Sequence, residues 1–127
     1  EDVITRLEAS PLYGHRIFWF TNLGDAGLSW LYERCHMALY PSLYEGWGLP
    51  VVEALQHRRP VVASNRGAVP EAGLGIARIV DPDDLAAWCD AVAETARAPR
   101  ANTPLAVAPS WNDAAQSIRS ILLRTAP

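Results

Sequence analysis

Apolar and polar positions along the chain follow two periods, one typical of strands and one typical of amphipathic helices. Short runs rich in β-branched and aromatic residues predict strands, and longer stretches with apolar residues three or four positions apart predict helices. The predicted strands are residues 16–20, 37–40, 61–63 and 76–80. The predicted helices are residues 2–9, 24–36, 50–57 and 81–96, with a last helix that Ser110 caps.

The predicted strands alternate with helices and are apolar on both faces. This order is typical of a parallel sheet covered by helices on both sides. We therefore expect one α/β domain over residues 1–127, with a Rossmann-like, doubly wound parallel sheet. Ligands of such sheets bind beyond the carboxyl ends of the strands. The loops at residues 21–24, 41–50 and 64–71 are thus the first places to search for a site.

Composition narrows the classes of function. The 127 residues are 50% hydrophobic and 20% charged, with a formal net charge of −3. The 11 basic residues, all arginines, are thinly spread and form no basic stripe, so we expect no nucleic acid partner. No apolar run is long enough to cross a bilayer. Cys35 and Cys89 stand singly in predicted helices, and no residue spacing suggests a metal site, so we expect reduced thiols in a cytoplasmic protein.

The loop at residues 41–50 carries the most chemistry. Gly46 and Gly48 allow the backbone to adopt positive φ and to approach a ligand closely. Pro50 suits the first turn of a helix, where its missing N–H is no loss. The free amides just before that helix, together with the helix dipole, favour an anion such as a diphosphate.

Two glutamates flank this turn. Glu53 falls at the end of the first helical turn, and helical side chains tilt toward the N-terminus, so its carboxylate should lean back toward the site. A carboxylate there suits hydroxyls, as does the ribose-binding acid of dinucleotide folds. Glu45, on the far side of the turn, can reach a group beyond the phosphates. The pattern indicates a nucleotide sugar, although a structural turn with two solvated glutamates remains an alternative at this point.

The segment SLYEGWGLPVVEAL at residues 42–55 resembles the signature of the retaining GT-B glycosyltransferases of family GT4 (glycosyl transferases group 1). In that family two glutamates separated by seven residues flank a Gly-Phe-Gly-Leu-Pro turn. The resemblance extends over essentially the whole chain and implies the C-terminal, nucleotide-sugar-binding lobe of a GT-B fold, incomplete at its N-terminus. It also implies no bound metal and no cofactor, with a nucleoside-diphosphate sugar as donor substrate.

The family's roles carry over residue by residue. Glu45 would hold hydroxyls of the transferred sugar and is our catalytic assignment, and Glu53 would accept hydrogen bonds from the ribose. Backbone amides of the turn would face the sugar and the diphosphate, and residues 22–23 would lie by the base. The expected donor-binding residues are Glu53, Gly46, Trp47, Gly48, Leu49, Asn22 and Leu23.

The resemblance implies that the intact enzyme moves a hexose, with mannose as one candidate, to a hydroxyl acceptor with retention, in glycan or polysaccharide biosynthesis. The acceptor site would belong to a separate N-terminal domain, and the cations for the diphosphate would precede Glu1. We therefore expect this chain alone to be inactive. Peripheral membrane contact through that domain and self-association of the chain are further expectations. The alternatives are a nucleotide-sugar epimerase on the same scaffold and a non-catalytic nucleotide-sugar-binding module.

The chain departs from the family where Gln56-His-Arg-Arg59 replaces a segment that usually contains glycine. Glycine there serves a left-handed helix C-cap, so an arginine in its place should carry strain or reshape the loop. Arg58, Arg59 and Arg66 are the cations nearest the predicted site. We expect them to be surface charges rather than phosphate ligands.

Overall fold

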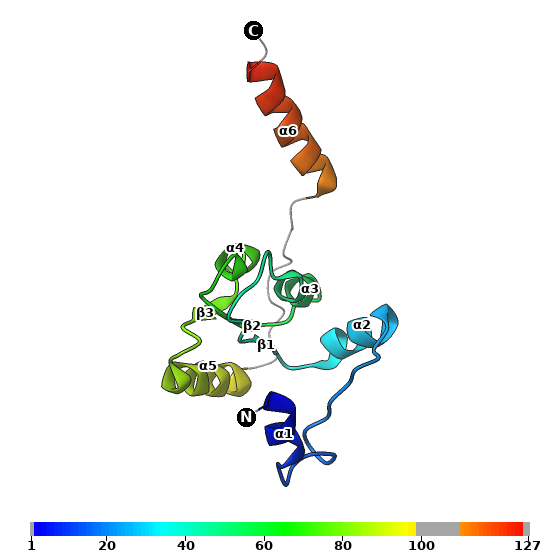
Figure 1. Ribbon diagram of the computed structural model, residues 1–127, viewed down its shortest axis with the longest axis vertical. Helices are drawn as coiled ribbons and strands as arrows, with labels where there is room; N and C mark the ends of the chain where they lie inside the picture. The colour runs from blue at the N-terminus through cyan, green and yellow to red at the C-terminus, as the bar shows by residue number, and fades with distance from the viewer. Residues whose placement is uncertain (1, 99–109, 126–127) are drawn as a thin grey trace. The chain divides into compact units, whose positions relative to one another are not determined.

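The computed structural model describes residues 2–98 and 110–125. The chain divides into two compact units, Glu1–Trp30 and Leu31–Pro127, and the boundary falls inside one helix. The elements in chain order are α1 (Val3–Glu8), α2 (Asp25–Arg34), β1 (Ala38–Tyr40), α3 (Leu49–Gln56), β2 (Val61–Ser64), α4 (Val69–Ala72), β3 (Arg78–Val80), α5 (Leu85–Arg97) and α6 (Trp111–Thr125) (Figure 1).

The sheet has three parallel strands in the order β1-β2-β3. Ala38 lies opposite Val61, and Val62 lies opposite Arg78. The central strand β2 is buried at all four of its positions, as the apolar run at residues 61–63 predicts. Because all three strands run in the same direction, their carboxyl ends at Tyr40, Ser64 and Val80 lie at one edge of the sheet.

The side chains of β2 alternate between two cores, because successive residues of a strand point to opposite faces. Val61 and Ala63 belong to a cluster with residues of α3 and α4, whereas Val62 packs with Val80 and with Trp88 of α5. Helices therefore cover both faces of the sheet, which confirms the doubly wound α/β class. Leu55 of α3 is fully buried, and burial of such a side chain contributes about 1.5–3 kcal/mol.

The predicted strand at residues 16–20 is wrong. The amide of Gly14 donates to the carbonyl of Ile17 (2.8 Å) and the amide of Ile17 donates to that of Leu12 (3.0 Å), so the backbone is engaged in a local turn. The only ladder contact in this part of the described chain is a single bridge between Tyr13 and Ile17. Residues 18–20 are about half exposed. Aromatic and β-branched residues favour strands through packing on a pleated surface, and here no neighbouring strand supplies it.

Helix α5 begins four residues later than predicted. Asp84 is its N-cap, and its Oδ1 accepts a hydrogen bond from the Ala87 amide (2.9 Å). Asp81 instead begins a turn, in which its carbonyl accepts from the Asp84 amide (3.1 Å). Both aspartates are good cap residues, so local sequence alone does not rank them. The predicted cap at Ser110 is confirmed, since the amide of Asp113 donates to Ser110 Oγ (3.2 Å) and the amide of Ser110 donates to Asp113 Oδ2 (2.8 Å) at the start of α6.

The loop that follows α3 keeps the left-handed conformation expected of a glycine, although an arginine occupies it. Arg58 has a φ of 57° and its amide donates to the carbonyl of Leu55 (2.9 Å). Arg59 then turns back into the core, where it is 9% exposed and its amide donates to the carbonyl of Ala54 (2.9 Å). A left-handed residue therefore follows this helix, and here it is an arginine under backbone strain.

This strain predicts that Arg58→Gly stabilises the protein. Relief of the left-handed strain exceeds the extra unfolded-state entropy of glycine, so we expect a net gain of about 0.5–1 kcal/mol in the free energy of unfolding. Arg58→Ala is the matched control because it removes the same charge and keeps the strain. Urea unfolding of the three proteins makes the comparison. Equal stability of the glycine and alanine variants would contradict the prediction.

Candidate functional site

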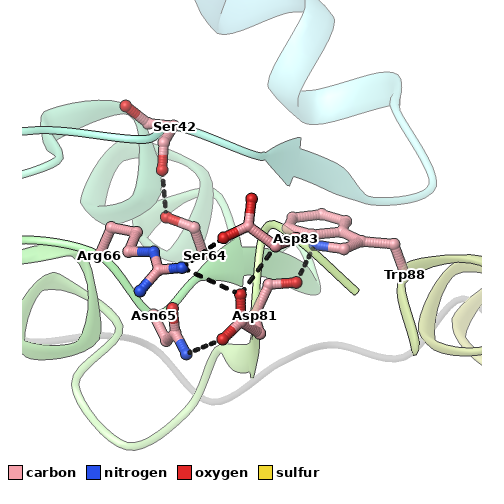
Figure 2. A network of polar contacts seen from close by, with 7 residues as sticks. All are labelled: Ser42, Ser64, Asn65, Arg66, Asp81, Asp83 and Trp88. Atoms are coloured by element: carbon pink, nitrogen blue, oxygen red, sulfur yellow. Dashed lines mark hydrogen bonds and ion pairs between the residues drawn. The ribbon is translucent and has the colours of Figure 1, made fainter. Parts of the chain in front are cut away.

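The loops that leave the three strands meet at the carboxyl edge of the sheet. The hydroxyl of the fully buried Ser64 donates to the carbonyl of Ser42 (2.5 Å), which ties the exit of β2 to the exit of β1 (Figure 2). The amide of Asn65 donates to the carbonyl of Val80 (3.0 Å), which ties it to the exit of β3. This is the edge at which ligands of parallel sheets bind.

The turn before α3 depends on glycine at one of its two predicted positions. Gly48 is the N-cap of α3 with a φ of 92°, and a Cβ there would lie 3.3 Å from the Cβ of Ala72 in α4. The left-handed conformation therefore favours glycine, and a Cβ would also crowd Ala72. The expectation of positive φ is wrong for Gly46, where a Cβ would meet open space. Only one left-handed residue is needed to turn the chain into the helix.

The start of α3 has the features of an anion-binding end. Pro50 stands at the second helical position. The first hydrogen bonds of the helix run from the amides of Val51 and Val52 to the carbonyl of Gly48 (3.0 and 3.4 Å). The amides of Gly48 and Leu49 precede this ladder, and such groups are available to a ligand. The side chains of Trp47 and Leu49 are 38% and 62% exposed beside them.

Glu53 is held by a tyrosine from α2. The phenol oxygen of Tyr32 lies 3.3 Å from Glu53 Oε2 and 3.3 Å from the carbonyl of Pro50, so its proton serves both acceptors. This contact draws the carboxylate toward the first turn of α3, in the direction that the helical tilt predicts. Burial, with the nearby Glu53 charge, raises the pKa of Tyr32 from 10.0 to about 12. The ring of Tyr32 stacks on His57, with centroids 5.4 Å apart.

Glu45 is held in the same way by a tyrosine at the end of β1. Tyr40 Oη donates to Glu45 Oε1 over 2.5 Å, and Ser42 Oγ donates to the same oxygen over 3.4 Å. Burial, with the hydrogen bond to Glu45, raises the pKa of Tyr40 to about 12. Within the described chain both contacts fall on Oε1, so Oε2 can accept hydrogen bonds from the hydroxyls of a ligand.

The nearby arginines are engaged with the protein itself. The guanidinium of Arg66 lies 3.2 Å from Asp81 Oδ1 and 2.6 Å from Asp83 Oδ2. Arg59 Nε donates to the carbonyl of His57 (2.9 Å). The backbone amide of Asp83, the side chain of Asn65 and the Arg66 charge hold the pKa of Asp81 below its ordinary value. These contacts support the expectation that Arg59 and Arg66 are not phosphate ligands.

The two residues expected to lie by the base stay predictions. Asn22 and Leu23 belong to the first compact unit, before α2, and their role at the base is untested.

In residues 2–98 and 110–125, no group of three or more His, Cys, Asp or Glu side chains is placed to hold a metal ion. None of the described helices is both long and apolar enough to cross a membrane.

Sequence reasoning missed the residues that support the two glutamates. Tyr32 stands on the apolar stripe of the predicted helix at 24–36, where a core role is the simpler interpretation. Tyr40 ends a short apolar strand. The available signal was a phenol hydroxyl in each half-buried position, since such a group needs a hydrogen-bond partner and both glutamates lie nearby in the predicted fold.

Comparison with known proteins identifies a family and several relatives. Residues 4–97 match the family described as glycosyl transferases group 1. A segment of 75 residues is 40% identical to O-antigen chain mannosyltransferase B of Escherichia coli, covering 57% of this chain and 20% of that protein. A segment of 69 residues is 44% identical to the MMP alpha-(1->4)-mannosyltransferase of Mycolicibacterium hassiacum, covering 51% and 16%.

A third relative is O-antigen chain mannosyltransferase RfbU of Salmonella typhimurium, which is 34% identical over 71 residues, or 56% of this chain and 20% of that protein. The matched segment thus spans a fifth or less of the length of each of these three relatives. No solved structure matches the chain.

The two supported phenols predict a pH dependence of stability. The pKa of Tyr32 and that of Tyr40 are about 12 in the folded chain, against about 10 in an unfolded one. Folding therefore favours the neutral phenols, so their contribution to stability is present below pH 10 and is lost as the pH rises toward 12. Tyr32→Phe and Tyr40→Phe should each make stability fall less steeply over this range.

Urea unfolding at a series of pH values, with tyrosinate absorbance recorded in the near ultraviolet, makes the measurement. Each variant should also lose one phenol that ionises late. Tyr44→Phe is the matched control, because it removes an 85% exposed phenol from the same loop. If the two variants follow the wild-type slope, folding does not hold these two phenols in the neutral form as described.

Proposed function

Since the chain belongs to the glycosyl transferases of group 1, we propose that it is the donor-binding half of a retaining GT-B glycosyltransferase. The intact enzyme moves a hexose from a nucleoside diphosphate to a hydroxyl acceptor in glycan or polysaccharide biosynthesis. Mannose is the first candidate, because the three relatives above are named as mannosyltransferases. Those names also favour transfer over an epimerase or a non-catalytic binding module.

The observation that carries this proposal is the pair of phenol-supported carboxylates on either side of the α3 N-terminus. A carboxylate, the amides of a helix N-terminus and a second carboxylate suit a ligand that carries hydroxyls on both sides of an anionic group. Glu53 accepts from the ribose, the amides of Gly48 and Leu49 face the diphosphate, and Glu45 accepts from the sugar through Oε2. Each carboxylate is already fixed by a neutral donor, Tyr32 for Glu53 and Tyr40 for Glu45, so little side-chain freedom is lost when the ligand binds.

Transfer then depends on stabilising the charge that develops on the departing diphosphate. Free amides and the positive end of the α3 dipole act where that charge appears, and they need no reorganisation during the reaction. Arg66 is engaged by Asp81 and Asp83, so further cations come from elsewhere in the intact enzyme. The departing phosphate takes the acceptor's proton on the same face of the sugar, which retains the anomeric configuration.

The two glutamates do not serve as the acid and nucleophile of a retaining glycosidase. Such a pair flanks the scissile bond at close range, and both members act on the sugar. Here Glu53 is assigned to the ribose, which lies beyond the diphosphate from the reacting carbon. Glu45 therefore orients the sugar without forming a covalent intermediate. The acceptor site and its domain lie in the rest of the intact enzyme.

The division of labour between the glutamates predicts different losses of affinity. Glu53→Ala removes a charge-assisted contact made with every nucleotide, so binding of both the nucleoside diphosphate and its sugar conjugate should weaken about ten- to a hundredfold. Glu45→Ala should weaken the sugar conjugate to a similar degree and leave the bare diphosphate nearly unchanged.

Calorimetric titration of the intact enzyme tests this, after a panel of GDP-mannose, UDP-glucose and UDP-N-acetylglucosamine has identified the tightest conjugate. Glu33→Ala is a control, because it removes a carboxylate that α2 exposes to solvent. Equal weakening of both ligands by Glu45→Ala would show that the pair acts as one unit. If no conjugate binds, or if neither mutant changes either affinity, the loop is a structural turn and the proposed function fails.

A further inference from the structure

The backbone of Glu45 rests on the turn that follows β2. Gly67 in this turn has a φ of +56°, and a Cβ built on it would lie 2.7 Å from the carbonyl oxygen of Glu45 and 3.3 Å from its amide nitrogen. The amide of Ala68 approaches the same carbonyl at 3.5 Å. No side chain fits between the two segments, so the Glu45 peptide is seated directly on the backbone of Gly67.

Hydrogen bonds and ion pairs also hold the turn that contains Gly67 to the exit of β3. The side chain of Asn65 donates to Asp81 Oδ2 (3.3 Å), and the guanidinium of Arg66 bridges Asp81 and Asp83 (Figure 2). The amide of Asp83 donates to the other oxygen of Asp81 (3.0 Å). Asp81 thus receives donors from both loops.

Asp81 is itself fixed to helix α5. The indole Nε1 of the buried Trp88 donates to the carbonyl of Asp81 (3.0 Å). Trp88 packs in the core cluster with Val62 and Val80. A single exposed ion pair stabilises little. Here, however, the ion pairs of Arg66 connect the Gly67 turn to Asp81, and the backbone of Asp81 is held by the core residue Trp88. The position of the turn therefore depends on the packing of the core.

We propose that Gly67 and Arg66 are positioning residues for Glu45. Gly67 seats the Glu45 peptide, and Arg66, bound by Asp81 and Asp83, holds the Gly67 turn in place. Tyr40 orients the carboxylate from its other side, so backbone and side chain of Glu45 are set by different strands. The inference rests on the proposed function, in which Glu45 contacts the sugar of the donor.

A pair of glycine variants tests the seat. Gly67→Ala and Gly75→Ala place a side chain at similar positive φ values, +56° and +68°, but a Cβ at Gly75 meets nothing within 4 Å. Both variants should lose stability through backbone strain. Only Gly67→Ala should weaken binding of the nucleotide sugar, by about tenfold, with the bare diphosphate nearly unchanged. Titrations use GDP-mannose and GDP, or the tightest conjugate of the panel and its own diphosphate.

A pair of arginine variants tests the fastening and serves if Gly67→Ala does not fold. Arg66→Ala removes the bridge to Asp81 and Asp83, and Arg78→Ala removes a similarly exposed ion pair between Arg78 of β3 and Glu94 of α5. Arg66→Ala should weaken the nucleotide sugar several-fold and spare the diphosphate, Arg66→Lys should restore part of the loss, and Arg78→Ala should change neither affinity. A merely structural role would lower stability without changing the ratio of the two affinities.

Two results would overturn the inference. Equal weakening of both ligands by Arg66→Ala would make Arg66 a phosphate ligand, and an unchanged ratio of affinities in both Gly67→Ala and Arg66→Ala would remove the positioning role. Glu45→Ala, measured in parallel, separates this failure from that of the proposed function. If Glu45→Ala distinguishes the two ligands and the positioning variants do not, only the present inference is lost.

Discussion

Parallel pairing of β2 with both of its neighbours makes the chain leave three strands at the same edge of the sheet. Because β2 is buried on both faces, this pairing cannot shift by one residue without moving Val61 and Val62 to the wrong cores. The exits of the strands are therefore brought together by the core, and the polar contacts between their loops refine an arrangement that packing already determines. The buried Ser64 hydroxyl and the Asn65 amide are the first of these contacts.

The two carboxylates at this edge, those of Glu45 and Glu53, are supported in the same way. Each accepts a hydrogen bond from a tyrosine whose burial favours the neutral phenol, and the tyrosines come from different elements, α2 and β1. At the start of α3, the left-handed Gly48 and the amides that precede the helical hydrogen-bond ladder supply donors for an anion. The edge therefore combines acceptors for hydroxyls with donors for an anion, which is the chemistry that a nucleotide sugar requires. Arg66 belongs to the support of the site through its two aspartates.

Periodicity and turn chemistry predicted most of the second compact unit. The α/β class, the three paired strands, the glycine turn before α3 and the cap at Ser110 follow from local patterns, and the left-handed position near Arg58 follows from a departure from the family. The failures have a common cause, which is dependence on distant partners. The run at residues 16–20 has strand propensity but no paired neighbour, and the choice of Asp84 over Asp81 as N-cap goes with the contact between Asp81 and Arg66.

The same cause explains what was missed at the site. Tyr32 and Gly67 lie far along the chain from the glutamates that they support, and only the fold brings them together. Local sequence predicted positive φ at Gly46 as readily as at Gly48, and only the folded backbone shows that Gly48 alone of the two adopts it. Residues that can bind a ligand or take part in a reaction are thus visible in the sequence, whereas the groups that orient them depend on tertiary contacts.

A crystal structure of the intact enzyme with its nucleotide sugar would show whether the donor binds at this edge of the sheet. We expect the ribose hydroxyls on Glu53, the diphosphate at the amides of Gly48 and Leu49, and a sugar hydroxyl on Glu45 Oε2, with the phenol of Tyr40 still on Oε1. A donor bound away from this edge, or a donor at this edge with both carboxylates contacting only their tyrosines, would contradict the proposed roles of Glu45 and Glu53.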